Sequence, residues 1–508
     1  MLSRIQEVVA IANSPVTDAV TKRQALDYLN QVKSEPSSSQ FFVSLLSDAN
    51  SDDLTKFVAL QVLTDLVKQG NGETQQLIFI KTAFLELLGS KITNDVRDPE
   101  YVRNKIAEMA TGLFYQMYGE INGNQWSSFF QDIIALLSIG ALKEGPIQNF
   151  SPLGVDYFAR ICGSINSEIA DQTFVSSREI QQKNNSLKDT MRVQDVQVLV
   201  AIWLNTLKIV APQQQSDLAA LTLSCIGSYI SWIDVNLIVN EIYVTVIYGY
   251  LDFSQTKIAC AQCLCEIISK KMKPMDKLTL LRMLNLTDKV SSIEHDDLEV
   301  YENLGHLSSS VGLELAKVFE QCVDTTPTNE LQQVANAADE QILNQVAPLV
   351  LKFMEHEYDS VTQQCFPFIS QYLSVLKKQY ALGGKPGSAV AINSKRIPLD
   401  QNHKEFLVSL MLVCFKKLRI DQSSDEDAED EIDEFNETIR SKLKVFQDSI
   451  AVINPPLYLD SISGHIQTLL TGTDWRDLEL AIYQMHNLSE TIPVSYTHLR
   501  AHETLSDL

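Results

Sequence analysis

Three cysteines have the residue type and spacing that most readily suggest chemistry: Cys260, Cys263 and Cys265 lie within six positions of one predicted helix. Clustered thiolates are typical zinc ligands, and a second Cys or His pair usually completes their tetrahedron. No such pair follows at zinc-site spacing, and three neighbours on one helix cannot close a tetrahedron. We therefore predict no metal here and interpret the three residues as small, buried apolar side chains, which is the usual role of free cysteine.

Two other motifs also fall short of a chemical site. Gly383-Gly384-Lys385 begins like a phosphate-binding loop, but no second glycine sits at the required spacing and Pro386 occupies the place of the Ser or Thr. His295-Asp296-Asp297 is a His–carboxylate cluster at a predicted helix start, where aspartate commonly caps. The eight histidines are scattered and no nucleophile-turn motif accompanies them. The sequence therefore predicts no enzyme and no cofactor.

Charge and hydropathy narrow the class of protein. The 508 residues carry a formal net charge of −23, yet 45% of them are hydrophobic, which is typical of folded rather than disordered acidic chains. Such a charge disfavours non-specific nucleic-acid binding, and we predict no DNA partner. The uncharged stretch Leu218 to Ile233 has 16 residues and is too short to span a bilayer, so we predict no membrane partner. The N-terminus lacks a secretory signal, which favours the cytosol or nucleus and reduced thiols.

Helical periodicity runs almost from end to end. Residues 52–69 place apolar side chains at the three-and-four spacing of one buried stripe. This stripe comprises Leu54, Phe57, Val58, Val62 and Leu66. Asp98 is placed to cap the next helix, with Pro99 at its first position. The strand-like run Tyr243 to Tyr250 is interpreted as a buried helix. Further helices are predicted over 187–208, 214–230, 254–271, 296–322, 336–355, 359–379, 402–418, 430–450 and 475–489.

The spacing of these helices predicts the architecture. Helices of 15–20 residues come in pairs that each occupy roughly forty to forty-five residues, which is typical of HEAT-type repeats. Such pairs bury their apolar stripes only by stacking, so we predict an all-α, HEAT-type α-solenoid. We divide it into repeats at 1–150, 151–381 and 400–493. Between the last two lies a Gly/Pro/Ser-rich loop at 382–399.

A strongly acidic segment interrupts the last group of repeats. Residues 421–437 hold ten carboxylates and no basic residue. Two interpretations stay open together, namely a solvated inter-helix loop and a loop that contacts a basic protein partner. The residues proposed for such a contact are Asp425, Glu426, Asp427, Glu429, Asp430, Glu431, Asp433 and Glu434.

Several ordered motifs resemble exportin-T, the karyopherin family that carries transfer RNA (tRNA) out of the nucleus. They are Ser51 to Phe57 with Gln61 to Leu63, Val102 to Lys105, Gly154 to Tyr157, Ile165 to Ile169, Leu187 to Arg192, Gly227 to Ile238 and Leu478 to Pro493. The resemblance covers about residues 17–493. Members of the family are about twice as long, so the sequence resembles an N-terminal half. The ending 494–508 resembles a translated sequencing adapter and is left out of the functional interpretation.

The resemblance implies capture of the small GTPase Ran in its GTP form by the N-terminal repeats, with the nucleotide held by Ran. The candidate contacts that carry over are Lys56, Phe57, Gln61, Arg103, Asn104 and Lys105. Phe57 lies on the predicted apolar stripe, so a core role is favoured over an interface anchor. Arg103 and Lys105 gain nothing from the helix dipole near a helix start, which favours exposure for recognition.

The tRNA needs a basic strip. Lys270, Lys271 and Lys273 are the best candidates, followed by Lys416, Lys417 and Arg419, although each cluster also fits an ordinary charged surface. The acidic segment would repel phosphate and so should meet Ran rather than tRNA.

The implied protein shuttles between nucleus and cytoplasm, contacts nuclear pore proteins, binds tRNA cooperatively with Ran-GTP, and releases it after GTP hydrolysis on Ran. Alternatives are a HEAT-type receptor for protein cargo and a cytosolic scaffold that ignores Ran.

Overall fold

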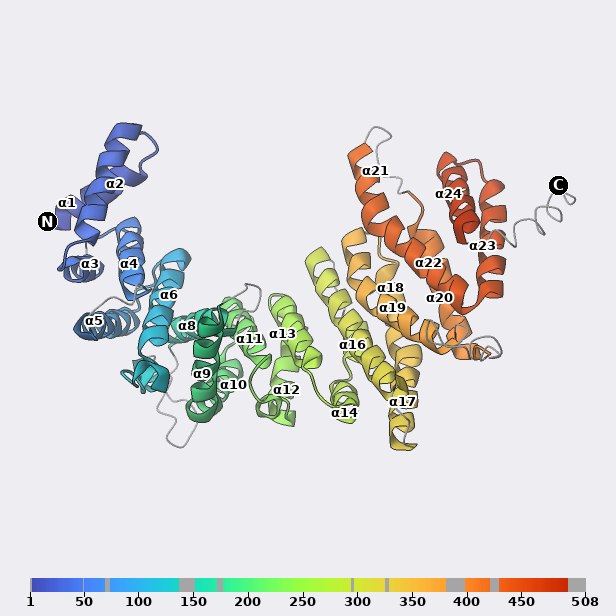
Figure 1. Cartoon of the computed structure of the whole chain (residues 1–508), viewed down its shortest axis with the longest axis horizontal. Coiled ribbons are helices and arrows are strands. Elements are labelled where there is room, and N and C mark those ends of the chain that lie inside the picture. Colours follow the sequence, from blue (N-terminus) through green and yellow to red (C-terminus); the bar gives the residue numbers. More distant parts are fainter. Residues whose placement is uncertain are drawn as a thin grey trace, which may run out of the picture. The chain divides into compact units, whose positions relative to one another are not determined.

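The computed structural model describes residues 2–48, 50–68, 74–136, 151–170, 177–293, 297–324, 329–380, 398–420 and 429–491. Every regular element within these ranges is helical (Figure 1), which confirms the all-α prediction. The predicted loop at 382–399, except its last two residues, and the tail 494–508 lie outside the described residues. The chain divides into two compact units, Met1–Ile267 and Ile268–Leu508.

The first unit contains twelve complete helices within its described residues. They are α1 (Leu2–Asn13), α2 (Ala19–Lys33), α3 (Ser38–Ser47), α4 (Asp53–Lys68), α5 (Thr74–Thr93), α6 (Glu100–Met117), α7 (Phe129–Leu136), α8 (Pro152–Ala170), α9 (Arg178–Gln194), α10 (Val196–Ile209), α11 (Ser216–Ile230) and α12 (Glu241–Gly249). Short 3-10 turns are η1 (Glu120–Asn122), η2 (Val235–Leu237) and η3 (Tyr250–Asp252). Helix α13 (Lys257–Ser269) crosses the unit boundary. Helices α4, α6, α8 and α11 pack in succession as one row, while α3, α5 and α7 pack as a second row against it.

The second unit repeats this two-row pattern. Its helices are α14 (Pro274–Leu284), α15 (Leu286–Ser291), α16 (Leu298–Asp324), α17 (Asn329–Gln341), α18 (Ala347–Met354), α19 (Asp359–Tyr380), α20 (Gln401–Lys417), α21 (Glu429–Phe435), α22 (Ser441–Ile453), α23 (Pro455–Leu470) and α24 (Trp475–Thr491). Two wider, π-helical turns, η4 (Ile342–Val346) and η6 (Asn436–Arg440), lie directly before α18 and α22. Helices α16, α19, α22 and α24 form one row, and α17, α18, α20 and α23 form the other. Stacked helix pairs of HEAT type therefore build each unit.

The predicted stripe of α4 is wrong in its rotation. Of its five members only Val62 is buried, whereas Leu54, Phe57, Val58 and Leu66 are half-exposed. The buried face is formed by Thr55, Ala59, Leu60, Val62, Leu63, Thr64 and Val67. Helix α4 packs against α1, α3 and α6, and small residues at its centre allow these helices to approach closely.

Helix boundaries differ from the prediction where polar side chains interrupt the periodicity. The predicted helix 187–208 is two helices that break at Asp195, whose carboxylate accepts a hydrogen bond from the buried Tyr118 hydroxyl. The run Tyr243 to Tyr250 is helical, as predicted, over most of its length in α12. All eight cysteines are buried, which confirms the burial predicted for Cys260, Cys263 and Cys265. Burial raises the pKa of Cys365 to about 12. Among the described residues, no helix is long and apolar enough to cross a membrane.

A buried histidine links three helices of the second unit. His403 is 3% exposed, and its Nδ1 lies 2.5 Å from Asp400 Oδ2 and 3.4 Å from the Tyr380 hydroxyl. Its Nε2 lies 3.3 Å from Asp339 on α17. Burial alone would lower the pKa of His403, but the hydrogen bonds and negative charges of Asp339 and Asp400 outweigh it, so the pKa is raised.

This raised pKa predicts the pH dependence of stability. A histidine with a raised folded-state pKa contributes stability fully below its unfolded value of about 6.5 and loses that contribution as pH rises through the folded value. We expect His403→Gln to lower the free energy of unfolding more at pH 6 than at pH 8.5, measured by urea denaturation. The exposed His306→Gln on α16 is the matched control. A loss that is equal at both pH values would contradict the prediction.

Candidate partner-binding sites

The structure brings the six predicted Ran contacts together, because α4 and α6 are neighbours in one row. Lys105 Nζ lies 5.9 Å from the ring centroid of Phe57, and the ring of Phe57 meets that of Tyr101 edge to face at 5.7 Å. Phe57 is half-buried rather than part of the core. With the half-buried Gln61, the exposed Asn104 and Tyr101, which is 49% exposed, it forms an accessible surface that we call the α4–α6 face.

Arg103 is not part of the α4–α6 face, so its predicted exposure is wrong. Its side chain is 8% exposed and forms an ion pair with Asp156 on α8. Its Nε also donates a hydrogen bond to the carbonyl oxygen of Asp98, at 3.1 Å. A guanidinium with these buried partners holds α6 against α8, and this role explains why it is withdrawn from solvent.

The predicted exposure of Lys105 is wrong for the same reason. Its side chain is 8% exposed, and its Nζ lies 2.5 Å from Glu108 on the same helix. Lys68 of α4 approaches the other oxygen of Glu108 at 2.9 Å. Burial alone would raise the pKa of Glu108, but hydrogen bonds and positive charge from the two lysines hold it below the ordinary value. The pair between Lys68 and Glu108 therefore links α4 to α6, while Lys105 is held within α6.

Asp98 has a different role from the predicted helix cap. Pro99, and not Asp98, is the N-cap residue of α6, and the N-cap makes no side-chain hydrogen bond to the start of the helix. The buried Asp98 carboxylate instead lies 2.5 Å from Lys91 Nζ and 3.7 Å from Lys56 Nζ. It also accepts a 3.4 Å hydrogen bond from the Tyr157 hydroxyl. Asp98 thus joins α4, α5 and α8 through one buried negative charge.

The network reaches the surface through Arg160. Its Nε lies 3.0 Å from Asp156, and its terminal nitrogen lies 3.1 Å from Glu100 and 2.5 Å from the Asn104 side-chain oxygen. Asp156 and Arg160 were missed by the sequence analysis. The available signal was Asp156 itself, a carboxylate inside the apolar run Gly154 to Phe158. A charge in such a position usually needs a buried partner.

The lysines proposed for tRNA lie in the connection between α13 and α14. Lys271 and Lys273 are exposed and Lys270 is half-buried. Lys273 is the N-cap residue of α14, at the positive end of that helix dipole, so helix stability does not account for it. The neighbouring Lys277 is buried and lies 2.8 Å from Glu314; burial lowers the pKa of Lys277 despite that partner.

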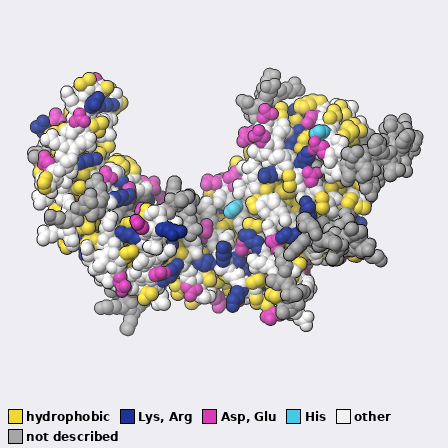
Figure 2. All heavy atoms as spheres, viewed as in Figure 1, with side chains coloured by type: hydrophobic (Ala, Val, Ile, Leu, Met, Phe, Trp, Pro, Cys, Tyr) yellow, Lys and Arg dark blue, Asp and Glu magenta, His cyan; other side chains and the backbone are white. Residues whose placement is uncertain are grey.

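The second basic cluster is engaged within the chain. Lys416 lies 3.1 Å from Glu355, and Lys417 lies 2.7 Å from Asp359. Arg419 lies 2.5 Å from Asp474 and 2.6 Å from Asp477. On the face drawn in Figure 2, basic and acidic side chains are similarly interspersed. Internal pairing makes this cluster a weaker RNA candidate than Lys271 and Lys273.

Part of the acidic segment lies outside the described residues, including Asp425, Glu426 and Asp427. Residues 429–431 begin α21, and their side chains are not described. Asp433 and Glu434 are exposed on the same helix. The predicted partner contact stays a prediction.

Stacked helix pairs with an accessible polar and aromatic face are typical of helical-repeat proteins that bind partners. A family model described as Exportin 1-like protein matches residues 99–264. The model described as Exportin-T matches residues 332–506. The chain belongs to the exportin-T family, as its resemblance predicted.

The relatives extend this match over nearly the whole chain. Exportin-T of Vanderwaltozyma polyspora is 64% identical over 493 residues, covering 97% of this chain and 46% of that protein. Exportin-T of Eremothecium gossypii is 54% identical, covering 97% and 47%. Exportin-T of Saccharomyces cerevisiae is 41% identical, covering 100% and 47%. The chain spans about half the length of the curated relatives it matches.

Proposed function

We propose that this chain acts in nuclear export of tRNA, as a receptor that binds tRNA cooperatively with Ran-GTP and shuttles between nucleus and cytoplasm. The observation that carries the proposal is the 64% identity to an exportin-T over 97% of the chain. Release would follow GTP hydrolysis on Ran, and passage would involve nuclear pore proteins. The receptor performs no chemistry of its own in this scheme.

The α4–α6 face supports the Ran part of the proposal. It combines a half-buried aromatic ring, Phe57, with the polar Gln61 and Asn104 and the exposed ring of Tyr101. Aromatic residues held by rigid neighbours are typical anchors of protein interfaces. Arg103 holds α6 against α8 and Lys105 is paired within α6, so both act on this face through its geometry.

Coupling between the two partners follows from the repeat architecture. Each helix pair contacts mainly its neighbours, so small rotations distributed along a row change its curvature at low local cost. If Ran-GTP and tRNA bind the same curvature, the first partner reduces the ordering cost of the second, and linkage makes the coupling reciprocal. The exposed Lys271 and Lys273 supply positive charge for phosphate.

A pull-down with Ran locked in its GTP form tests the proposal. We expect capture of Ran-GTP but not Ran-GDP, and stronger capture when tRNA is added. Gln61→Ala should weaken capture about five- to tenfold, because it removes an accessible amide of the α4–α6 face. Gln75→Ala, an exposed amide on α5, is the matched control and should bind like the unaltered protein.

Two outcomes would count against this account. Folded, helical protein that captures neither form of Ran would contradict the Ran assignment. If Gln61→Ala leaves the GTP-selective capture unchanged, the α4–α6 face is not part of the Ran interface. Arg103 is a poor choice of variant here, since its loss leaves Asp156 short of a buried partner.

A further inference from the structure

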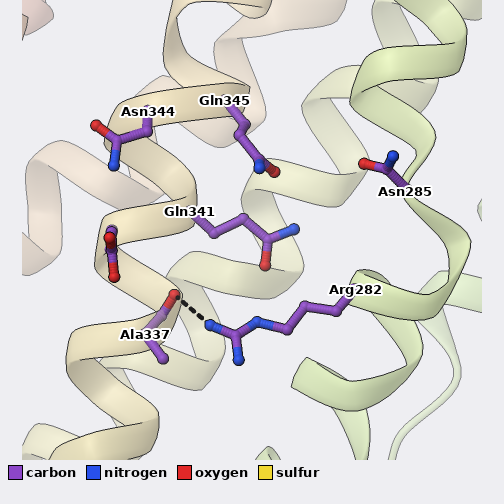
Figure 3. Close-up of a pocket in the computed structure, with 7 residues that line it drawn as sticks. Arg282, Asn285, Ala337, Gln341, Asn344 and Gln345 are labelled. Carbon is purple, nitrogen blue, oxygen red and sulfur yellow. Dashed lines mark hydrogen bonds between the residues drawn. The ribbon is translucent and has the colours of Figure 1, made fainter.

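A polar cavity lies within the second unit, between α14 with the following Asn285 and α17 with η4 (Figure 3). Its volume is about 260 Å³, smaller than a typical drug-sized site. The lining comprises Arg282, Asn285, Ala337, Glu340, Gln341, Asn344 and Gln345. Six of these seven residues carry polar side chains, so the cavity suits a small polar group rather than an apolar anchor.

Gln341 marks this cavity as unusual. The residue is 9% exposed, and its Oε1 is buried without a hydrogen-bond partner among the residues that the structure describes. A buried acceptor left unpaired is costly, and most such groups in native proteins are satisfied. Figure 3 shows the Gln341 amide directed across the cavity toward Arg282. A ligand that donates a hydrogen bond at this point would satisfy it.

Arg282 supplies hydrogen-bond donors to the same cavity. Its side chain extends from α14 toward α17, and a terminal nitrogen donates a long hydrogen bond of 3.5 Å to the carbonyl oxygen of Ala337. No ion pair joins Arg282 to another residue in the described part of the chain, and the residue is exposed. A guanidinium has five N–H donors, so several face the cavity and its mouth without a strong acceptor. The cavity therefore offers positive charge beside an unpaired acceptor.

The π-helical turn explains why the amides converge. Residues Ile342–Val346 have the wider π geometry, and Gln341 immediately precedes them. Figure 3 shows Gln341 and Gln345 on the side of this turn that faces Arg282. Single π-helical turns are uncommon and occur frequently at functional sites.

The donor and acceptor pattern selects among ligands. A fully ionised phosphate or a phosphodiester group only accepts hydrogen bonds, so by itself it would pair with Arg282 but leave the Gln341 acceptor unsatisfied. A ribose 2′-hydroxyl both donates and accepts, and in RNA it lies next to a backbone phosphate. It is also the group that lets a protein distinguish RNA from DNA.

We propose that this cavity binds one ribose-phosphate step of RNA, with Gln341 Oε1 accepting from the 2′-hydroxyl and Arg282 donating to the adjacent phosphate. The site recognises RNA by its sugar and not by base sequence, which suits a receptor for many RNAs of one shape. This inference rests on the proposed function and adds to it one residue, Gln341, that recognises the ribose.

The test compares a synthetic tRNA acceptor-stem hairpin with the same hairpin carrying 2′-fluoro at every ribose, using fluorescence anisotropy and the full chain. Fluorine keeps the A-form sugar pucker but cannot donate a hydrogen bond. The unaltered protein should bind the hydroxyl form about five- to tenfold more tightly, as expected for one or two hydrogen bonds with a buried partner. Gln341→Leu should bind both forms equally, with its affinity for the fluoro form unchanged.

Two further variants separate charge from sugar recognition. Arg282→Gln should weaken both forms alike and reduce the slope of log affinity against log salt by about one, as loss of one phosphate contact does. Gln333→Leu, an exposed amide on the same helix outside the cavity, is the matched control and should keep the full preference. Thermal melting establishes that each variant is folded.

Each contrary result has a distinct meaning. Equal binding of both hairpins by the unaltered protein overturns the sugar assignment and leaves the proposed function standing. A preference that survives Gln341→Leu places the recognition elsewhere and also overturns it. Absence of binding to either hairpin contradicts both the cavity proposal and RNA binding by this chain.

Discussion

Replacing Asp156 with alanine is expected to lower the free energy of unfolding of the first unit by about 3–5 kcal/mol. Asp156 is the carboxylate that pairs with Arg103 across α6 and α8, and it also binds Arg160 at 3.0 Å. The side chains of Asp156 and Arg103 are each 8% exposed, so water cannot replace the lost partner. The cost arises mainly from the buried, unpaired guanidinium that remains. Urea denaturation followed by circular dichroism measures it.

A surface carboxylate of the same network supplies the control. Glu100 lies 3.1 Å from Arg160, but its side chain is 70% exposed. Exposed ion pairs contribute little, so Glu100→Ala should cost less than about 1 kcal/mol. A loss of under 1 kcal/mol in Asp156→Ala would show that the buried pair does not hold α6 to α8.

The second large effect concerns the contact between α16 and α19. A Cβ added at Gly312 would lie 2.6 Å from Cδ2 and 2.7 Å from Cγ of the Phe368 ring. Phe368 is fully buried, so the ring cannot move away without displacing its neighbours. We expect Gly312→Ala to destabilise the second unit by about 1–3 kcal/mol, as overpacking usually does. The expected change in stability has the opposite sign to the effect of helix propensity, which favours alanine over glycine by about 1 kcal/mol.

Gly464 on α23 separates packing from propensity. A Cβ at this position meets no atom within 4 Å. Gly464→Ala should therefore raise the melting temperature, since only the propensity gain remains. Stabilisation by both substitutions would contradict the close approach of α16 and α19 at Gly312.

Helical periodicity predicted the fold class because a two-row stack of helices needs only apolar stripes at regular spacing. It did not predict which side of α4 is buried. Helix α4 contacts several neighbours, and its buried face includes Ala59, Thr55 and Thr64, residues that a search for large apolar side chains overlooks. Rotation about a helix axis is set by the neighbours, and local sequence does not record it.

The sequence likewise predicted only part of the candidate site. The motifs named Lys56, Phe57 and Arg103 as candidates, and the packing of α4 against α6 brings their helices together. The motifs did not indicate the direction in which each side chain points. Arg103 is buried because Asp156, 53 positions away, meets it. A partner so distant in sequence becomes visible only when the helices are stacked. The cavity at Gln341 depends in the same way on a π-helical turn that no residue pattern announced.

We propose that this chain couples RNA binding to Ran-GTP, and a titration of labelled tRNA with and without saturating Ran-GTP tests this coupling most directly. We expect Ran-GTP to tighten tRNA binding by about five- to 150-fold, the usual range of coupling between two sites, and Ran-GDP to have no effect. Equal tRNA affinity in all three conditions, with Ran-GTP shown to be bound, would contradict it.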